Sequence, residues 1–545
     1  MLKYLWSWWT TKSRRDQLLD NIAEARIYEE WIAAAHSLDE CMDYDMWRQD
    51  PMSKHYNYRL LQDRLKSLID AQENGDVTEL TNIIRTGLVR HLGNITAPPL
   101  YNKAFNGTKT LIEDYVGEVA HCIDLIAMAK TTPAPGALLT GQEKLETLHD
   151  MRASLGRSAL VLQGGAIFGL CHIGVVKALH LRGLLPRIIA GTATGALIAA
   201  LVCVHTEEDL LEALSGAHIN IEAFTKRSNP DGGPRSGWYQ TLIRRVKRWY
   251  ATGHLLDVDV LEEVLKANIG DLTFEEAYDK TKRILNITIN TSGGGGVPTL
   301  LNHMTAPNVL IRCAALASNT TASSALYRPV IVLCKDMHGE IVPWPLATQA
   351  TFRPSSHATY RDRRSPLHRL SELFNVNHYI VSQARPYLAP VLRSDLHHPN
   401  PKQDGRWRLT MPILRFAVLE LQHRLRQADQ LGFMSPSIRR FLLDEQVPGP
   451  SLTIVPELSP RDFLKLLDNP TTEMIDYWIH KGERSVWPAV TSLQVRLAVE
   501  IEIERGYQLV RRRRQQPSRT GSMTVNDTAR RQRTKSFGDS VEHAG

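Results

Sequence analysis

Between Ser158 and Val204 the chain repeats one pattern twice: a short apolar run, a glycine-rich turn, and a helical segment. SALVLQ (158–163) precedes the first turn, and PRIIAG (186–191) precedes the second. RILNITIN (283–290) and NHYIVSQ (377–383) are further strand candidates, separated by helical stretches. Strands that alternate with helices favour an α/β layer with a largely parallel sheet. We therefore predict an α/β core that begins near Ser158.

Helical periodicity dominates on both sides of this core. Segments such as 25–40 and 58–72 repeat apolar residues at three- and four-residue spacing, whereas 131–145 is rich in Pro, Gly and Thr and is typical of a linker. We expect five parts: an aromatic and basic leader (1–20), a helical N-terminal domain (21–150), the α/β domain (155–395), a helical C-terminal region (396–510) and a disordered basic tail (511–545).

The charge of the chain is concentrated in its tail. The 545 residues carry a formal net charge of +7. Residues 511–545 contain nine Lys or Arg and three Asp or Glu, which leaves the first 510 residues near +1. We therefore expect no nucleic-acid partner for the folded part. A polybasic stretch beside Ser and Thr, RRQRTKS (530–536), suits contact with anionic lipid that phosphorylation adjusts.

Several classes of protein are excluded by composition. The six cysteines are far apart and none forms a CxxC pair, so we expect reduced thiols in a cytoplasmic protein, with no zinc ribbon and no disulfide framework. Residues 188–204 carry no charge, but Gly191 and Gly195 interrupt them, so a strand, a tight turn and a buried helix explain them better than a membrane span. We expect neither a transmembrane span nor a signal peptide. Three tryptophans at 6, 8 and 9 could rest at a membrane interface or pack on the domain.

The first glycine-rich turn runs from Gly164 to Gly169, directly after a strand candidate and before a helix. Such a turn presents unpaired backbone N–H groups at a helix N-terminus, where an anion or an oxyanion can bind. Its spacing does not match the G-x-G-x-x-G fingerprint of dinucleotide-binding proteins.

The second turn, GTATG (191–195), has the frame of the G-x-S-x-G nucleophile elbow, in which the central side chain points into an active site. The nucleophile position holds Ala193. A methyl group can neither attack a carbonyl carbon nor be activated by a base.

With both turns, residues 162–201 resemble the patatin-like phospholipase family, and most closely its fungal triacylglycerol-lipase branch. Other blocks resemble the same branch: 29–40, 85–95 and 107–115 its N-terminal helical domain, and 270–290, 300–311 and 370–392 its later segments. The resemblance spans roughly residues 25–510. It implies a three-layer α/β core with a mostly parallel sheet, flanked by helical regions, and a protein of lipid metabolism.

The family implies a Ser–Asp dyad that cleaves acyl esters of glycerolipids, with no metal and no cofactor. The elbow serine attacks, an aspartate in a later D-G-G/A/S motif acts as base, and amides of the glycine-rich loop stabilise the oxyanion. The resemblance assigns the oxyanion loop to Gly164, Gly165, Ala166 and Gly169. It assigns the elbow to Gly191, Thr192, Thr194 and Gly195, with the nucleophile position at Ala193.

The dyad aspartate is missing in the same alignment. The branch pattern D-G-S-V-D-x-D-L-P-x-x-R-L, laid without gaps on 358–370, puts the aspartate at Ala358 and its glycine at Thr359. Both halves of the dyad are therefore substituted. We expect a catalytically impaired member of the family that binds glycerolipid, a lipid-droplet surface or a membrane surface, or that regulates an active paralogue.

Two other interpretations stay open. The first is an active glycerolipid hydrolase or lysophospholipid acyltransferase with non-standard residues, and the second is a non-catalytic scaffold. The hydroxyls of Thr192 and Thr194 flank the lost serine, and Asp231 begins a literal D-G-G inside an ordinary turn. Two pairs fit the H-x-x-x-x-D acyltransferase spacing: His254 with Asp259, and His357 with Asp362. About one such match is expected by chance, so the pattern carries almost no weight. We expect His172 to be a packed, hydrogen-bonded residue and the run Gly293–Gly296 to be a loop.

Overall fold

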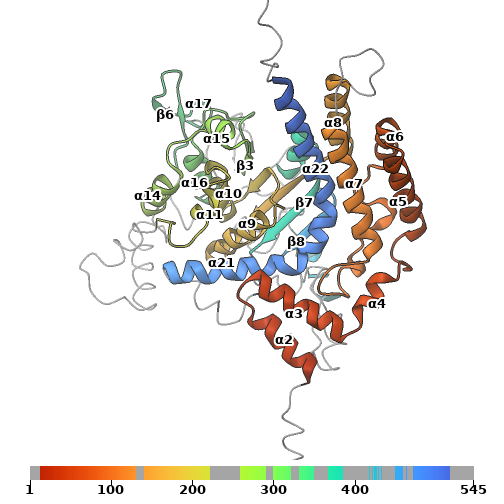
Figure 1. The fold of residues 1–545 in the computed structure, drawn as a ribbon. Coiled ribbons are helices and arrows are strands. Elements are labelled where there is room, and N and C mark those ends of the chain that lie inside the picture. The colour runs from red at the N-terminus through yellow and green to blue at the C-terminus, as the bar shows by residue number, and fades with distance from the viewer. Residues whose placement is uncertain are drawn as a thin grey trace, which may run out of the picture. The chain divides into compact units, whose positions relative to one another are not determined.

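The computed structural model of the chain describes residues 13–129, 140–220, 258–289, 299–320, 330–348, 366–384, 448–457 and 471–515, with isolated residues between 416 and 462 (Figure 1). Contacts divide the chain into two units. One comprises Met1–Gln62, Arg90–Asp114 and Gly156–Ala498, and the other comprises Asp63–Val89, Tyr115–Leu155 and Val499–Gly545. Residues of the range 21–150, where we expected a helical N-terminal domain, occur in both units.

The first unit contains a six-stranded sheet in the order β4-β3-β2-β1-β7-β8. Neighbouring strands from β3 to β8 are parallel, and only β4 is antiparallel to its neighbour β3. The strands are β1 (Arg157–Gln163), β2 (Ile188–Gly191), β3 (Ile284–Thr288), β4 (Leu300–Leu301), β7 (Val376–Gln383) and β8 (Ser451–Ile454). The predicted mostly parallel sheet is thus confirmed. A separate antiparallel pair joins β5 (Leu333–Lys335) to β6 (Ile341–Pro343).

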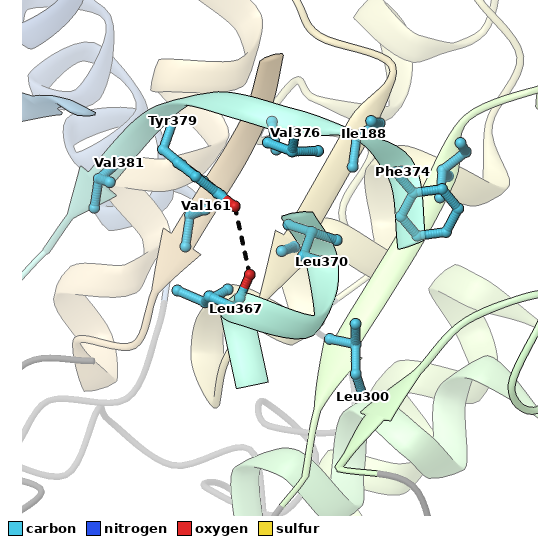
Figure 2. Close-up of a cluster of buried hydrophobic side chains, with 12 residues drawn as sticks. Val161, Ile188, Leu300, Leu367, Leu370, Phe374, Val376, Tyr379 and Val381 are labelled. Atoms are coloured by element: carbon cyan, nitrogen blue, oxygen red, sulfur yellow. Dashed lines mark hydrogen bonds between the residues drawn. The ribbon is translucent and has the colours of Figure 1, made fainter. Parts of the chain in front are cut away.

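Helices cover both faces of this sheet. On one face, α18 (Pro366–Phe374) packs Leu367 and Leu370 against Val161 and Val381 of the central strands, as Figure 2 shows. Successive side chains of a strand point to opposite faces, so Ser382 faces away from α18. There its hydroxyl is hydrogen-bonded to His172 of α9 (Cys171–Leu181). Helices on both faces of the sheet make up the three-layer α/β arrangement that we predicted.

The helices on the second face also include α10 (Thr194–Val204), which packs on β1, β2 and β3, and α21 (Thr472–Val486), which packs along α9 (Figure 1). Next to α10 lie α14 (Val258–Ile269), α15 (Phe274–Thr281) and α16 (Ile311–Thr320). The uncharged stretch 188–204 is therefore a buried strand, a turn and a buried helix, as predicted. Among the described residues, no helix combines the length and the apolar character that crossing a membrane requires.

One strand lies in a region that we expected to be mostly helical. Our prediction for 396–510 contained no strand, but β8 lies inside that range and pairs in parallel with β7. Its four residues follow Pro448-Gly449-Pro450 and are too few to show an alternating pattern. This part of the C-terminal region therefore belongs to the α/β sheet.

Other α-helices among the described residues of the first unit are α2 (Arg14–Glu24), α3 (Tyr28–Cys41), α4 (Tyr44–Gln49) and the short α11 (Leu210–Ala213) and α17 (Pro345–Thr348). A satellite core joins Ala25, Trp31 and Ala35 to Trp487, which follows α21 directly. In the described residues the second unit is helical: it holds α6 (Val77–Gly87), α8 (Gly141–Leu155) and most of α5 (Tyr58–Glu73), α7 (Thr110–Met128) and α22 (Val490–Gln515). The α22 helix continues past residue 511, where we placed the start of the tail, because arginine is a good helix former and its charge suits a helix C-terminus.

Candidate active site

The elbow is a strand–turn–helix joint with Ala193 at its tip. Ala193 lies between β2 and α10 with φ 55° and ψ −123°, a conformation that residues with a side chain rarely adopt. Both flanking positions must be glycine, because the neighbouring backbone leaves no room for a Cβ at either of them. A Cβ on Gly195 would lie 2.0 Å from the carbonyl oxygen of Leu162, and one on Gly191 would lie 2.5 Å from the carbonyl oxygen of Gly195. Ala193 therefore has the backbone geometry of a nucleophile elbow.

A small hydrogen-bond network holds this turn in place. The N–H of Ala193 donates to Ser318 Oγ at 3.0 Å, and the Ser318 hydroxyl donates to the carbonyl of Thr288 at 2.7 Å. The hydroxyls of Thr192 and Thr288 lie 2.6 Å apart, and the Thr192 N–H donates to the Leu162 carbonyl at 3.1 Å. Sequence analysis missed Ser318 and Thr288. Thr288 lies at the carboxyl end of a predicted strand, which is a signal for a site in a parallel sheet; Ser318 on α16 gives no such signal.

The side chain at the tip has no chemical function. Ala193 is 9% exposed, and its methyl group faces the first glycine-rich turn, since a Cβ on Gly164 would lie 2.9 Å from Ala193 Cβ. The two turns that we singled out in the sequence are thus adjacent. Other predicted positions lie outside the described residues: Ala358, Thr359, Asp231, His254, His357, Asp362 and Gly293–Gly296.

The amide of Gly165 in the glycine-rich loop is paired, not free. Gly165 N–H donates to Thr194 Oγ1 at 3.1 Å. We expected the amides of this loop to be unpaired. The Gly165 amide is paired because Thr194 begins α10 and its side chain lies against the loop. A Cβ on Gly169 would lie 2.8 Å from Thr194 Cβ, and one on Gly165 would lie 2.6 Å from the Ala384 carbonyl oxygen. The loop then continues as a 3₁₀ turn, η3 (Ala166–Leu170), into α9.

His172 of α9 is hydrogen-bonded to residues of β1 and β7. Its ring is fully buried, with Nε2 2.6 Å from the Gln163 carbonyl oxygen and Nδ1 2.7 Å from Ser382 Oγ. A carbonyl only accepts, so Nε2 carries the proton and Ser382 donates to Nδ1. Burial lowers the pKa of His172 to about 4, which keeps the ring neutral. His172 is a packed, hydrogen-bonded residue, as predicted.

The α21 helix supports the loop from the other side. Phe168 of the loop meets Trp478 edge-to-face, with ring centroids 5.2 Å apart, and Trp478 is fully buried. The two helices cross at glycines: a Cβ on Gly174 would lie 1.8 Å from the carbonyl oxygen of Ile479, and one on Gly482 would lie 2.0 Å from that of Cys171. This support comes from a segment that sequence analysis assigned to a separate helical region.

Comparison with known proteins identifies the family. A family model described as patatin-like phospholipase matches residues 160–337, and one described as a domain of unknown function (DUF3336) matches residues 8–153. Triacylglycerol lipase ptl1 of Schizosaccharomyces pombe is 34% identical over 88% of this chain and 83% of its own. Triacylglycerol lipase ptl3 of the same organism is 31% identical over 89% and 95%, and Triacylglycerol lipase 4 of Saccharomyces cerevisiae is 31% identical over 94% and 55%. The chain belongs to the patatin-like triacylglycerol lipase family.

In this lipase fold, elements outside the matched residues 160–337 complete the core. The strands β7 and β8 extend the sheet beside β1, and α21 supports the glycine-rich loop. The Ala384 carbonyl, directly after β7, lies against Gly165. The environment of the loop therefore depends on chain far downstream of the family match.

The two hydroxyls that flank Ala193 in this lipase elbow have structural partners, and other candidate groups of the chain are also accounted for. The Thr192 hydroxyl is bonded to Thr288, and the Thr194 hydroxyl accepts from Gly165. Asp336 caps the β5–β6 turn by accepting from the backbone N–H groups of His338 and Glu340. Burial raises the pKa of Cys203 to about 12, so it is no thiolate nucleophile at neutral pH. Within the described ranges, no three metal-ligating side chains lie close enough to hold an ion.

Proposed function

We propose that this chain is a glycerolipid-binding member of the lipase family that has lost ordinary patatin-type hydrolysis. The observation that carries the proposal is Ala193 at the tip of an otherwise intact elbow. An acyl-enzyme needs an oxygen or sulfur nucleophile at that point, and a methyl group supplies neither. In serine hydrolases, loss of the nucleophile lowers kcat on the order of a millionfold and leaves only the contribution of binding and the oxyanion hole.

The second half of the proposal concerns the base. The family alignment puts the dyad aspartate at Ala358 and its glycine at Thr359, and three arginines follow closely, at 361, 363 and 364. In this alignment, a serine at position 193 would still lack a base to take its proton.

The activity test uses triacylglycerol, phospholipid and a p-nitrophenyl ester as substrates. The chain as it stands is compared with Ala193→Ser/Ala358→Asp/Thr359→Gly and with Gly165→Ala, whose new Cβ would lie 2.6 Å from the Ala384 carbonyl and would displace the loop. We expect equal background rates for the unchanged chain and Gly165→Ala, and a higher rate for the triple variant. Turnover by the unchanged chain well above the Gly165→Ala rate would refute the loss of hydrolysis and favour an enzyme with non-standard residues.

The cellular role that fits this proposal is peripheral attachment to a lipid droplet or membrane from the cytoplasm, with binding of lipid or regulation of an active paralogue. The basic tail supports attachment to an anionic surface. Flotation with liposomes tests it, comparing the full chain with a truncation after Gln515, where α22 ends, and with Arg530, Arg531, Arg533 and Lys535 all changed to Gln. We expect both variants to float less with vesicles that contain phosphatidylserine and equally with neutral ones. Unchanged flotation would exclude the tail as the contact, and absence of any lipid binding would favour the scaffold.

A further inference from the structure

Thr194 controls access to an amide of the glycine-rich loop. We infer that its hydroxyl closes the oxyanion site of this chain, so that the site takes neutral acyl groups in preference to carboxylates. The inference rests on the proposed function in one respect only, the assignment of the Gly164–Gly169 loop as the oxyanion loop. It does not depend on the loss of the dyad.

The packing places the Thr194 side chain inside the loop. Its Oγ1 accepts the Gly165 N–H at 3.1 Å. A Cβ on Gly169 would meet Thr194 Cβ at 2.8 Å and Oγ1 at 2.9 Å, and one on Gly164 would lie 3.7 Å from Oγ1. The side chain thus lies against three glycines of the loop. A ligand oxygen would have to compete with the Thr194 hydroxyl for the Gly165 N–H.

A second amide at the elbow is used in the same way. The Ala193 N–H donates to Ser318 Oγ at 3.0 Å, and that hydroxyl is itself fixed by its bond to the Thr288 carbonyl. Two backbone donors beside the turn tip are therefore satisfied by hydroxyls of this chain. An incoming oxyanion that uses either of these two amides would first have to displace the bond that the amide already makes.

The chemistry predicts which ligands this arrangement disfavours. A carboxylate or a tetrahedral oxyanion gains more from a backbone N–H than a neutral carbonyl does, because a bond to a charged acceptor is roughly twice as strong. Occupation of the amide therefore weakens binding of the anion selectively. The net value of one hydrogen bond corresponds to a roughly three- to tenfold change in dissociation constant.

Thr194→Val and Thr194→Ser form the test pair. Valine keeps the shape of threonine and removes the acceptor, so it frees the Gly165 amide without opening a cavity. Serine keeps the acceptor and serves as the matched control. Titration calorimetry measures binding of decanoate, the anionic probe, and of decanamide, its neutral counterpart, to the full-length chain and to both variants. Circular dichroism and the melting temperature establish that each variant is folded, and Thr194→Ala replaces the valine variant if it is not.

We expect Thr194→Val to bind decanoate roughly five- to tenfold more tightly than the unchanged chain does. Thr194→Ser should stay within about twofold, and decanamide binding should change less than twofold throughout. Equal or weaker decanoate binding by Thr194→Val, including no binding at all, would overturn the inference, because the freed amide must then contribute nothing. A weaker value would mean that the hydroxyl itself donates to the anion.

These outcomes are independent of whether the chain hydrolyses esters. Decanoate binding needs no nucleophile, so turnover by the unchanged chain would refute the proposed function and leave this result standing. In the Ala193→Ser/Ala358→Asp/Thr359→Gly background, adding Thr194→Val should raise kcat several-fold with KM nearly constant, since the freed amide acts on the oxyanion of the transition state. A change in KM alone would assign Thr194 to packing instead.

Discussion

The crossing of α9 and α21 at Gly174 gives the most demanding test of how the site is supported. The variant Gly174→Ala adds one methyl group. Its Cβ would lie 1.8 Å from the Ile479 carbonyl oxygen, whereas real Cβ atoms essentially never come closer than 3.0 Å to a neighbour. Alanine gains about 1 kcal/mol of helix propensity over glycine. Overpacking against backbone costs about 3 kcal/mol, at the upper end of its usual range, because a carbonyl cannot change rotamer to escape. We expect a net loss of about 2 kcal/mol in the free energy of unfolding.

The matched control is Gly117→Ala in α7, where a Cβ would meet nothing within 4 Å. It should gain about 0.5–1 kcal/mol from helix propensity alone. Hydrogen exchange read by mass spectrometry suits a chain with two units, because it reports each helix separately. We expect faster exchange in α9 and α21 for Gly174→Ala, and unchanged or slower exchange in α7 for Gly117→Ala. Equal exchange in α9 and α21 for the unchanged chain and Gly174→Ala would refute the argument from close packing.

Three further variants test single features. Ala193→Gly should raise the free energy of unfolding by about 1 kcal/mol in urea titrations, because glycine adopts φ 55° without strain. The lowered pKa of His172 means that the unfolded chain binds the extra proton between pH 6.5 and about 4, so stability falls as the pH drops through that window. From pH 7 to pH 5 the free energy of unfolding should fall by about 2 kcal/mol from this residue. The melting temperature of His172→Gln should therefore fall less over that range than that of the unchanged chain. Asp271→Asn should lower the free energy of unfolding by about 2 kcal/mol in thermal unfolding, because it removes one of two carboxylates that pair with Arg312. The Arg312 side chain is only 7% exposed, and Glu262 at 3.0 Å would be its remaining carboxylate partner.

Those parts of the fold that depend on residues adjacent in the sequence could be predicted from it. The apolar runs before Gly164 and Gly191 gave β1 and β2, because a buried strand followed by a glycine turn is a local pattern. The partners of the elbow could not be predicted. Ser318 and Thr194 act through bonds to Ala193 and Gly165, residues 125 and 29 positions away. Such bonds follow from how α16 and α10 pack on the sheet, and nothing in their local sequence indicates it.

The crossing of α21 on α9 was missed for a related reason. Gly482 lies in the middle of a helical stretch, where a glycine only weakens the helix when it is considered locally. Its meaning depends on Cys171, whose carbonyl oxygen would lie 2.0 Å from a Cβ at that position. The β8 strand was missed because its pairing with β7 provides the stabilisation that four residues lack on their own.

The elbow keeps its shape without a catalytic side chain because the turn is also a structural joint. The strain at Ala193 costs about 1–3 kcal/mol, so something other than residue 193 must hold the turn. That role falls to the close approach of Gly195 to β1 and to the bonds that Thr192 and Ser318 make with Thr288. None of these contacts involves the side chain at 193. A serine introduced there would therefore occupy the nucleophile position with no change of backbone. Under the proposed function, two further obstacles to chemistry remain: the family alignment places Ala358 where the base should stand, and Thr194 occupies the Gly165 amide.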